Sequence, residues 1–204
     1  MSSFYHDGNR QLQERFDTGR LANLLEERAV SDTIGENDKA FIEARDMFFL
    51  ATCDADGRPN CSYKGGDPGF VRVIDEHTVA FPNYDGNGMY LSMGNVLKNP
   101  SVGLLFIDFE NQHRMRLNGV AAIDEHDPLM AEYPEAQFIV RVRAQQVFPN
   151  CPRYIHRYQL VERSTYVPRS GCETPVPDWK AGIAQQVPEL LPANDPARHE
   201  VEHE

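Results

Sequence analysis

The sequence predicts a mainly β protein, a small antiparallel barrel with helices in front of it and one helix within the barrel sequence. Short apolar runs separated by tight turns recur from Phe48 to Val120. Residues 102–107 are almost entirely apolar, which is typical of a strand buried on both faces. Two later segments, 114–121 and 136–144, alternate with the two-residue period of a strand. Closing such a sheet removes its exposed edges, and this favours a barrel.

The length and charge of the chain limit the possible classes of protein. Its 204 residues fit one domain with extensions. The net charge is -11, of which residues 1–46 and 189–204 contribute -4 each, so the middle is nearly balanced. An acidic molecule repels nucleic acid and anionic lipid, and we expect neither as a partner.

The same composition indicates a cytoplasmic protein. No apolar run approaches the ~20 residues of a membrane span, and the first eleven residues are too polar for a secretory signal. The four cysteines form no Cys-x-x-Cys pair, so we expect reduced thiols. The seven histidines show no metal-ligand spacing, so we expect no metal site.

Two helices are expected before the barrel. Residues 10–29 carry apolar side chains at helical spacing, interrupted near Gly19, and residues 37–46 indicate a short second helix. Asn37 or Asp38 is expected near the start of the latter. A hairpin then joins strands at 47–53 and 60–66, because the Asp, Gly and Pro residues between them favour a tight turn.

Further strands follow from the same signals. They are expected at 70–74, 78–83, 102–107, 114–121 and 136–144, with a helix over 89–98 that Asn99-Pro100 ends. A short helix and a last strand are expected within 151–167. The prolines beyond Cys172 argue against a compact second domain, and 190–204 is expected to be a disordered or loosely docked acidic tail. The expected organisation is an N-terminal helical extension (1–36), a barrel domain (37–168) and a proline-rich tail (169–204).

Several of these segments, in this order, resemble the pyridoxamine 5'-phosphate oxidase-like flavoproteins. The resemblance covers about residues 38–150. It rests on Phe49-Leu50-Ala51-Thr52, Asp56-Gly57-Arg58-Pro59, the loop and helix ending in Asn99-Pro100, the strand 102–106, and Arg116-Leu117-Asn118-Gly119. It implies a six-stranded FMN-binding split barrel and a homodimer with FMN in two clefts at the interface. It also implies a small-molecule substrate or electron donor.

The resemblance places the first candidate site residues on the strand that leaves the hairpin. Ser62, Tyr63 and Lys64 match the family strand that meets the flavin, and Lys64 would supply a cation for the phosphate or a donor to the ring. Gly65, with the glycine after it, would permit a close backbone approach. A bulge on an edge strand with a solvated lysine is the alternative.

The loop and first helical turn after residue 82 supply the next candidates. They are Asn83, Asp85, Asn87, Met89 and Ser92, which lie where the family places the phosphate and the ribityl chain. This stretch has no basic residue before Lys98, a departure from the family. The charge opposite a phosphate must then come from Lys64, Arg114 or Arg116.

The last candidates come from the second half of the barrel. Alternation places Arg114, Arg116 and Asn118 on one strand face, where the family contributes a polar side chain to the flavin; a solvated outer face is the alternative. Cys151, Arg153 and Tyr154 lie in a stretch that in FMN-binding relatives follows the last barrel strand. That stretch would close the site from the partner subunit, and a buried cysteine at a turn is the alternative.

No catalytic side chain can be assigned from the sequence, since no nucleophile and base occur at a useful spacing. True pyridoxamine phosphate oxidases end in a segment with Trp and Arg. Here the single tryptophan, Trp179, stands in a proline-rich stretch without the arginines, and this argues against that activity. The resemblance therefore leaves an FMN-dependent oxidoreductase, a flavin carrier or sensor without turnover, and a deazaflavin- or heme-binding member of the fold.

Overall fold

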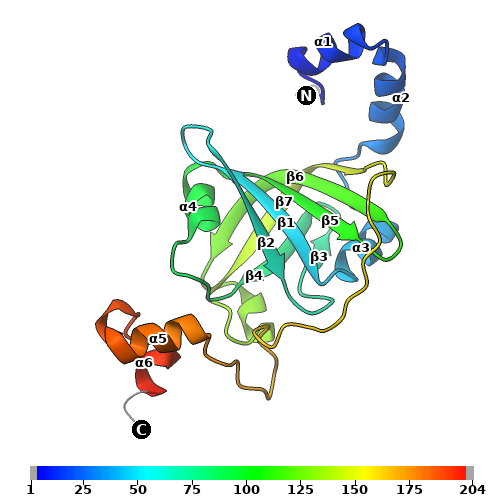
Figure 1. The fold of residues 1–204 in the computed structure, drawn as a ribbon. Helices are drawn as coiled ribbons and strands as arrows, with labels where there is room; N and C mark the ends of the chain where they lie inside the picture. The colour runs from blue at the N-terminus through cyan, green and yellow to red at the C-terminus, as the bar shows by residue number, and fades with distance from the viewer. Residues whose placement is uncertain (1–3, 201–204) are drawn as a thin grey trace. The chain divides into compact units, whose positions relative to one another are not determined.

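A computed structural model describes residues 4–200, with the side chains of residues 199 and 200 excepted (Figure 1). The chain divides into two compact units, residues 1–161 and residues 162–204, which are described separately. No helix in the described part of the chain is long and apolar enough to cross a membrane.

One antiparallel sheet forms the centre of the first unit. Within the described residues it has seven strands, in the order β2-β1-β5-β6-β7-β4-β3. The strands are β1 (Met47–Cys53), β2 (Pro59–Gly65), β3 (Arg72–Asp75), β4 (Thr78–Asn83), β5 (Ser101–Asp108), β6 (His113–Asp124) and β7 (Phe138–Pro149). This confirms the predicted mainly β split barrel, with seven strands where the resemblance implied six.

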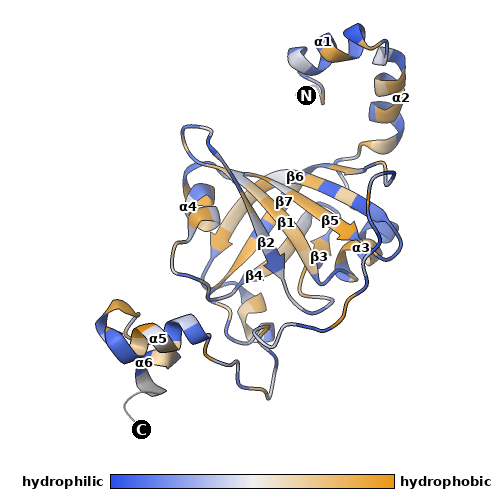
Figure 2. Cartoon of the chain, viewed as in Figure 1, coloured by the Kyte–Doolittle hydropathy of each residue, from blue (hydrophilic) through white to orange (hydrophobic). Residues whose placement is uncertain are grey.

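Apolar side chains from every second position of the strands fill the barrel interior. Phe48 and Leu50 on β1 pair in register with Phe106 and Leu104 on β5, and all four are buried. Figure 2 shows many hydrophobic residues, in orange, along these strands. The alternation places the intervening residues of the same strands on the outer face of the sheet.

The helices of the first unit are α1 (Asp7–Arg15), α2 (Gly19–Ala29), α3 (Glu36–Glu43) and α4 (Leu91–Lys98). The predicted break near Gly19 is the start of α2. The cap of α3 lies at Gly35, two residues before Asn37, the earlier of the two predicted positions. The Gly35 N–H donates to the Asp38 carboxylate at 3.0 Å. Asp38 therefore closes the first turn from inside the helix, as in a capping box. Asn99 ends α4, followed by Pro100.

The region after β7 differs from the prediction. Residues 151–167 form neither the expected helix nor the expected strand. The second unit instead contains α5 (Asp178–Gln186), a 3₁₀ turn (Pro188–Leu190) and α6 (Pro196–Glu200). The small side chains of Ala184 and Ala197 let these short elements pack around Leu191.

A buried ion pair adds to this C-terminal unit. Lys180 Nζ lies 2.6 Å from Asp195 Oδ2, and both side chains are almost fully buried. Residues 190–200 were expected to belong to a disordered or loosely docked tail, but in the structure they belong to this packed unit. Proline does not prevent this, because Pro188 and Pro196 each stand at the first position of a short helical turn, where proline is tolerated.

Gly119 marks an irregularity in the longest strand pair. The register of β6 and β7 shifts between Asn118 and Gly119, which is the signature of a β-bulge. A Cβ atom at position 119 would lie 2.2 Å from the carbonyl oxygen of Arg143, a backbone atom that cannot rotate away. The motif that carries the family resemblance therefore needs glycine for a steric reason.

We predict that Gly119→Ala lowers the free energy of unfolding by about 1–3 kcal/mol, because the added methyl group overpacks the bulge. Chemical denaturation checks this. Gly94→Ala is the matched control, since a Cβ at position 94 meets no atom within 4 Å on the exposed side of α4. That control should be neutral or stabilise by roughly 0.5–1 kcal/mol. Equal effects of the two substitutions would contradict the steric account.

Candidate functional site

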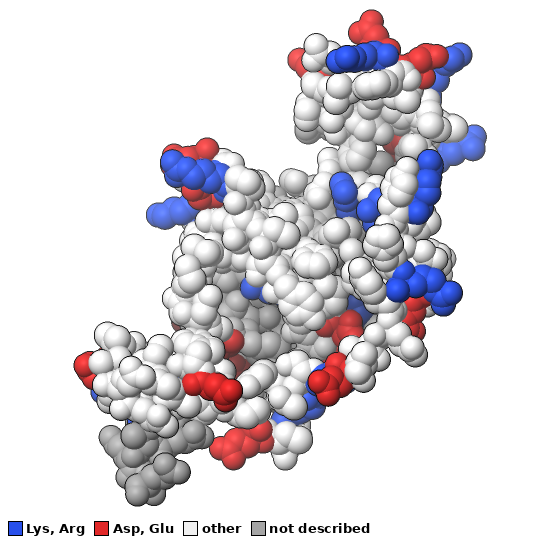
Figure 3. All heavy atoms as spheres, viewed as in Figure 1, with Lys and Arg blue, Asp and Glu red and all other residues white. Residues whose placement is uncertain are grey.

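A pocket lies between β2 and the segment that runs from the end of β4 into α4. Its cavity volume is about 210 Å³. The residues that line it are Asn60, Cys61, Ser62, Lys64, Asn83, Tyr84, Gly86, Asn87, Gly88, Met89, Tyr90, Leu91, Ser92 and Met93. Figure 3 shows a hollow in this face of the molecule with a basic group recessed in it. Amides and hydroxyls dominate the lining, so the pocket suits a polar ligand.

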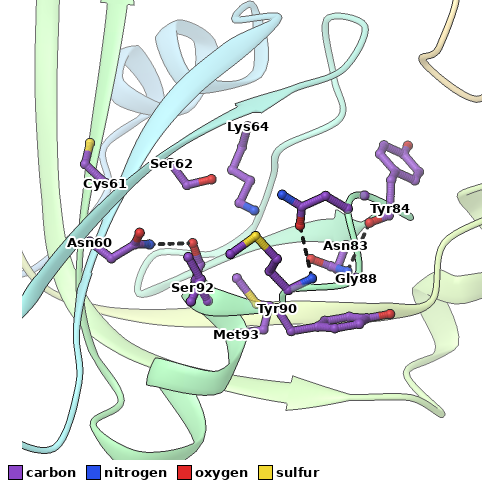
Figure 4. Close-up of a pocket in the computed structure, with 14 residues that line it drawn as sticks. Asn60, Cys61, Ser62, Lys64, Asn83, Tyr84, Gly88, Tyr90, Ser92 and Met93 are labelled. Carbon is purple, nitrogen blue, oxygen red and sulfur yellow. Dashed lines mark hydrogen bonds between the residues drawn. The ribbon is translucent and has the colours of Figure 1, made fainter. Parts of the chain in front are cut away.

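Hydrogen bonds from asparagine side chains fix α4 beside the hairpin. Asn60 on β2 donates to the Ser92 hydroxyl at 3.0 Å, in the first turn of α4 (Figure 4). Asn95, one turn later, donates to the hydroxyl of Thr52 on β1 at 3.1 Å. Ser92 and Thr52 are buried. These bonds hold the N-terminus of α4 at the pocket, where backbone N–H groups without helical partners favour an anion.

The loop between β4 and α4 is held by one glutamine. The Gln137 side-chain oxygen accepts from Asn83 Nδ2 at 2.9 Å and from the Tyr90 hydroxyl at 3.0 Å. The Gln137 backbone N–H donates to the Asn83 carbonyl at 2.8 Å. Tyr90 has φ of 49°, in the left-handed region that a non-glycine residue occupies only at a cost. The clasp therefore fixes a strained residue at the cap of α4.

Lys64 is the one pocket-lining residue with a positively charged side chain. Its side chain points from β2 into the pocket, beside Ser62 and across from Asn83 (Figure 4). Burial lowers the pKa of its amine, and within residues 4–200 no hydrogen bond or ion pair to that amine is found. A partly desolvated cation without a counter-charge attracts an anion that enters the pocket.

Tyr84 adds a neutral phenol to the lining. Burial, with smaller contributions from the nearby Tyr133 and Asp67, raises the pKa of its hydroxyl to about 12. The hydroxyl consequently stays protonated at neutral pH and can donate a hydrogen bond. In Figure 4 the Tyr84 ring points away from Lys64. Ser62, Ser92 and the asparagines of the lining offer neutral donors around that cation. This set can bind a phosphate-like anion joined to a hydroxyl-bearing group.

Six of the predicted site residues meet at the pocket: Ser62, Lys64, Asn83, Asn87, Met89 and Ser92. Three others lie beside lining residues without lining it themselves: Tyr63, Gly65 and Asp85. Tyr63 alternates to the outer face of the sheet, where its ring packs against Phe49 at 6.2 Å between centroids. A Cβ at Gly65 would lie 2.7 Å from that tyrosine ring. Position 65 therefore needs glycine to leave room for the Tyr63 ring. The sequence had instead predicted that this glycine lets the backbone approach a ligand ring.

Arg114 and Arg116, two of the predicted site residues, lie on the outer face of the sheet, opposite the barrel interior. Leu117 and Met115 on β6 point into the barrel, so Arg114 and Arg116 share the outer face of the strand. The alternation predicted the shared face, and the outer face is where the alternative interpretation placed it. The Arg114 Nε atom is buried, and it has no hydrogen-bond partner among the described residues. In a single protomer neither arginine lines the pocket that contains Lys64.

Cys151, Arg153 and Tyr154 likewise lie outside the pocket. The Asn150 N–H donates to the Arg114 carbonyl at 3.2 Å, which ties this segment to the start of β6. A hydrogen bond from the Arg153 backbone lowers the pKa of the exposed Cys151 thiol, and the charges of Arg153 and Arg114 lower it further. The predicted residues thus do not all meet in one protomer, because Arg114, Arg116 and the segment after β7 lie outside the pocket.

Several pocket residues were missed by the sequence reasoning. Asn60 precedes Ser62 and Lys64 by two and four positions on the same strand, so strand alternation could have identified it. Tyr84 and Tyr90 gave no such signal, because their places depend on the loop conformation that Gln137 fixes. Among the described residues, no group of three or more His, Cys, Asp or Glu could hold a metal ion.

We predict that Lys64→Met raises the free energy of unfolding at neutral pH, because the substitution removes a desolvated charge that has no counter-ion among the described residues. Burial holds the folded-state pKa of Lys64 below the ordinary lysine value of about 10.4, so the wild type gains stability as pH rises from that lowered pKa towards the ordinary one. The difference between variant and wild type should therefore shrink over that pH range. Denaturation curves at several pH values check this. Lys98→Met, at the exposed far end of α4, should show no gain; a gain as large as that of Lys64→Met would contradict the argument.

The chain is similar to several known proteins. Among solved structures, similarity is found to an FMN-binding protein from Syntrophomonas wolfei (11% identity, 69% of this chain and 97% of that chain, TM-score 0.45). It is also found to HupZ from Group A Streptococcus (19% identity, 57% and 93%, TM-score 0.46) and to the heme storage protein HutZ from Vibrio cholerae (23%, 56% and 93%, TM-score 0.41). No curated protein matches the chain.

The family model described as pyridoxamine 5'-phosphate oxidase matches residues 34–163. This range is more than half of the chain, and it contains α3, the whole sheet and the pocket. The protein therefore belongs to the pyridoxamine 5'-phosphate oxidase family.

Proposed function

We propose that this protein binds FMN in the pocket and acts as an FMN-dependent oxidoreductase on a small molecule. The observation that carries the proposal is Lys64, a partly buried amine without a counter-charge within residues 4–200, at a site lined with hydroxyls and amides. FMN has a phosphate for the cation, a hydroxyl-bearing chain for the neutral donors, and a flat ring.

The residues present fit the phosphate end of FMN. Lys64 would provide the charge, while Ser62, Ser92 and the first N–H groups of α4 would provide donors. Asn83 and Asn87 would face the hydroxyl-bearing chain from the loop. No basic residue occurs between Asn83 and Lys98, so Lys64 would be the cation that one protomer's pocket lining offers to the phosphate.

The pocket of one protomer is too small to be the complete site. Its volume of about 210 Å³ lies below the roughly 300–1,000 Å³ of pockets that enclose small ligands. We propose that a second copy completes it, so that the protein acts as a homodimer. The group on the outer face, with Arg114, Arg116 and the segment from Cys151 to Tyr154, would then face the partner's pocket. The buried Arg114 Nε without a partner supports a contact of this kind.

FMN, when bound, would supply the redox chemistry by accepting and returning a hydride equivalent. The chain's own residues would bind and orient it. The Gln137 clasp would keep the loop in place, and Lys64 would neutralise the phosphate. Positioning of a donor beside the cofactor contributes several kcal/mol to catalysis without any reacting side chain. Catalysis by positioning needs no paired nucleophile and base, and none is found in the pocket among the described residues.

We predict that the purified protein binds FMN, and that Lys64→Ala weakens binding roughly 10- to 100-fold, as expected for about 1.5–3 kcal/mol from a charged donor. Fluorescence titration measures the affinity, and mass spectrometry identifies any ligand released by heat. Lys98→Ala is the control with the same charge change outside the pocket. Arg116→Ala should also weaken binding if the partner's arginine reaches the site.

Three results of that experiment would count against the proposal. Failure of the wild type to bind FMN would remove its basis. Release or tight binding of a deazaflavin or of heme would assign the pocket to another cofactor. Equal FMN affinities of the Lys64→Ala variant and the wild type would place the phosphate elsewhere.

We further predict that the FMN-loaded protein is reduced by a small-molecule hydride donor. Anaerobic stopped-flow mixing with NADH, NADPH or a reduced deazaflavin should bleach the flavin absorbance with at least one of them. Free FMN mixed with the same donors gives the background rate. Tight FMN binding without bleaching by any donor above that background would favour a carrier or sensor over an enzyme.

A further inference from the structure

The first two helices contact each other through polar side chains. Arg10 of α1 donates to Asn23 of α2 at 2.6 Å and pairs with Glu26 of α2 at 3.3 Å. The Arg10 guanidinium also lies over the Tyr5 ring, 4.7 Å from its centroid, and the Tyr5 hydroxyl donates to the Ala22 carbonyl. Ala22 is the only residue of either helix that is buried in the described structure.

The large apolar side chains of these helices point away from that contact. The exposed fractions of Leu12, Phe16, Leu21, Leu24 and Leu25 lie between 39% and 67%. Leu12 of α1 lies four residues before Phe16, the C-cap residue of that helix, and the three leucines share one side of α2. Apolar residues thus lie outside and polar residues inside, the reverse of the arrangement in a helix that packs on its own core. We call these five residues, which lie on the hairpin of helices α1 and α2, the hairpin face.

Both ends of the helical segment are attached to one place on β7. The Phe4 ring packs edge-on against Phe148 at 5.2 Å, before α1. After α2, Ser31 and Val147 exchange backbone hydrogen bonds of 3.0 and 2.7 Å. Neither helix packs extensively on any strand. Phe148 is the register partner of Arg116, on the outer face of the sheet. The segment therefore starts and ends beside the surface that the proposed homodimer would cover.

We propose that the hairpin face is an interface that a second copy of this chain covers. The face exposes on the order of 500 Å² of apolar side chain, if a large side chain presents roughly 150–250 Å² when fully exposed. Two such faces supply about half or more of the roughly 1,200–2,000 Å² that a stable interface buries. The adjoining outer face of the sheet, with Phe49, Leu105 and Ile107 only partly buried, would supply the rest. The inference rests on the homodimer of the proposed function and is independent of its ligand.

The charges around the hairpin face favour a second copy over other partners. Residues 7–29 contain five acidic and four basic side chains. A helix that lies on an anionic membrane, or one that binds nucleic acid, carries an excess of Lys and Arg on its polar side. A nearly balanced set of both signs can face itself across a two-fold axis without net repulsion.

The test is sedimentation velocity of the full chain without FMN, over a range of micromolar concentrations. The variant Leu21→Lys/Leu25→Lys places two charges on the hairpin face. Its matched control, Gln11→Lys/Glu27→Gln, changes the net charge by the same +2 at exposed polar positions. We expect wild type and control to sediment as dimers, and the leucine variant to show a dimer Kd at least tenfold higher with unchanged circular dichroism. If that variant misfolds, Leu21→Ser/Leu25→Ser replaces it.

Three outcomes would overturn the inference. The wild type could be monomeric, or the leucine variant could dimerise as tightly as the wild type. The leucine variant could also keep the wild-type mass and lose thermal stability, which would show that the face is covered within one chain. A parallel FMN titration of the wild type separates these results from a failure of the proposed ligand, because sedimentation is measured without FMN.

Discussion

Contacts between aromatic rings inside the barrel are the constraint on which the candidate site depends. Phe48 of β1 is fully buried, and its ring centroid lies 5.0 Å from that of Phe81 and 5.3 Å from that of Phe106. β1 and β4 are separated by three strands in the sheet order, so the Phe48–Phe81 contact joins distant parts of the sheet across the interior. Phe48 is the register partner of Lys64, and Phe81 precedes Asn83 by two residues. One packed cluster thus sets the spacing of both pocket walls.

The site is built at some cost to stability. Lys64 loses hydration without gaining a partner in the described structure, and Tyr90 adopts a left-handed backbone. Each arrangement is unfavourable by itself and persists because neighbours hold it: the hairpin register for Lys64 and the Gln137 hydrogen bond for Tyr90. Such features concentrate where a protein binds a ligand, since a stable core has no use for them.

The sequence predicted the barrel well because its strands follow local rules. Alternation predicted that Arg116 and its neighbour Leu117 lie on opposite faces of β6, and they do. Asn99-Pro100 ends α4 as expected. Six of the residues that the family resemblance suggested line the pocket, and they do so together because they follow one strand or one loop. The missed ones depend on long-range contacts: Tyr90 reaches the pocket through Gln137, 47 residues away. The C-terminal helices were missed because prolines argued against order, whereas the Lys180–Asp195 pair and small buried alanines stabilise them.

The position of Trp179 determines what intrinsic fluorescence can report. It is the single tryptophan of the chain, it lies at the start of α5 in the C-terminal unit, and 48% of it is exposed. Emission from this residue follows the unfolding of the second unit, while the far-ultraviolet signal of the seven strands follows the barrel. Transitions that coincide by both probes would indicate a single cooperative molecule. Separate transitions would indicate that the C-terminal unit gains and loses its structure on its own.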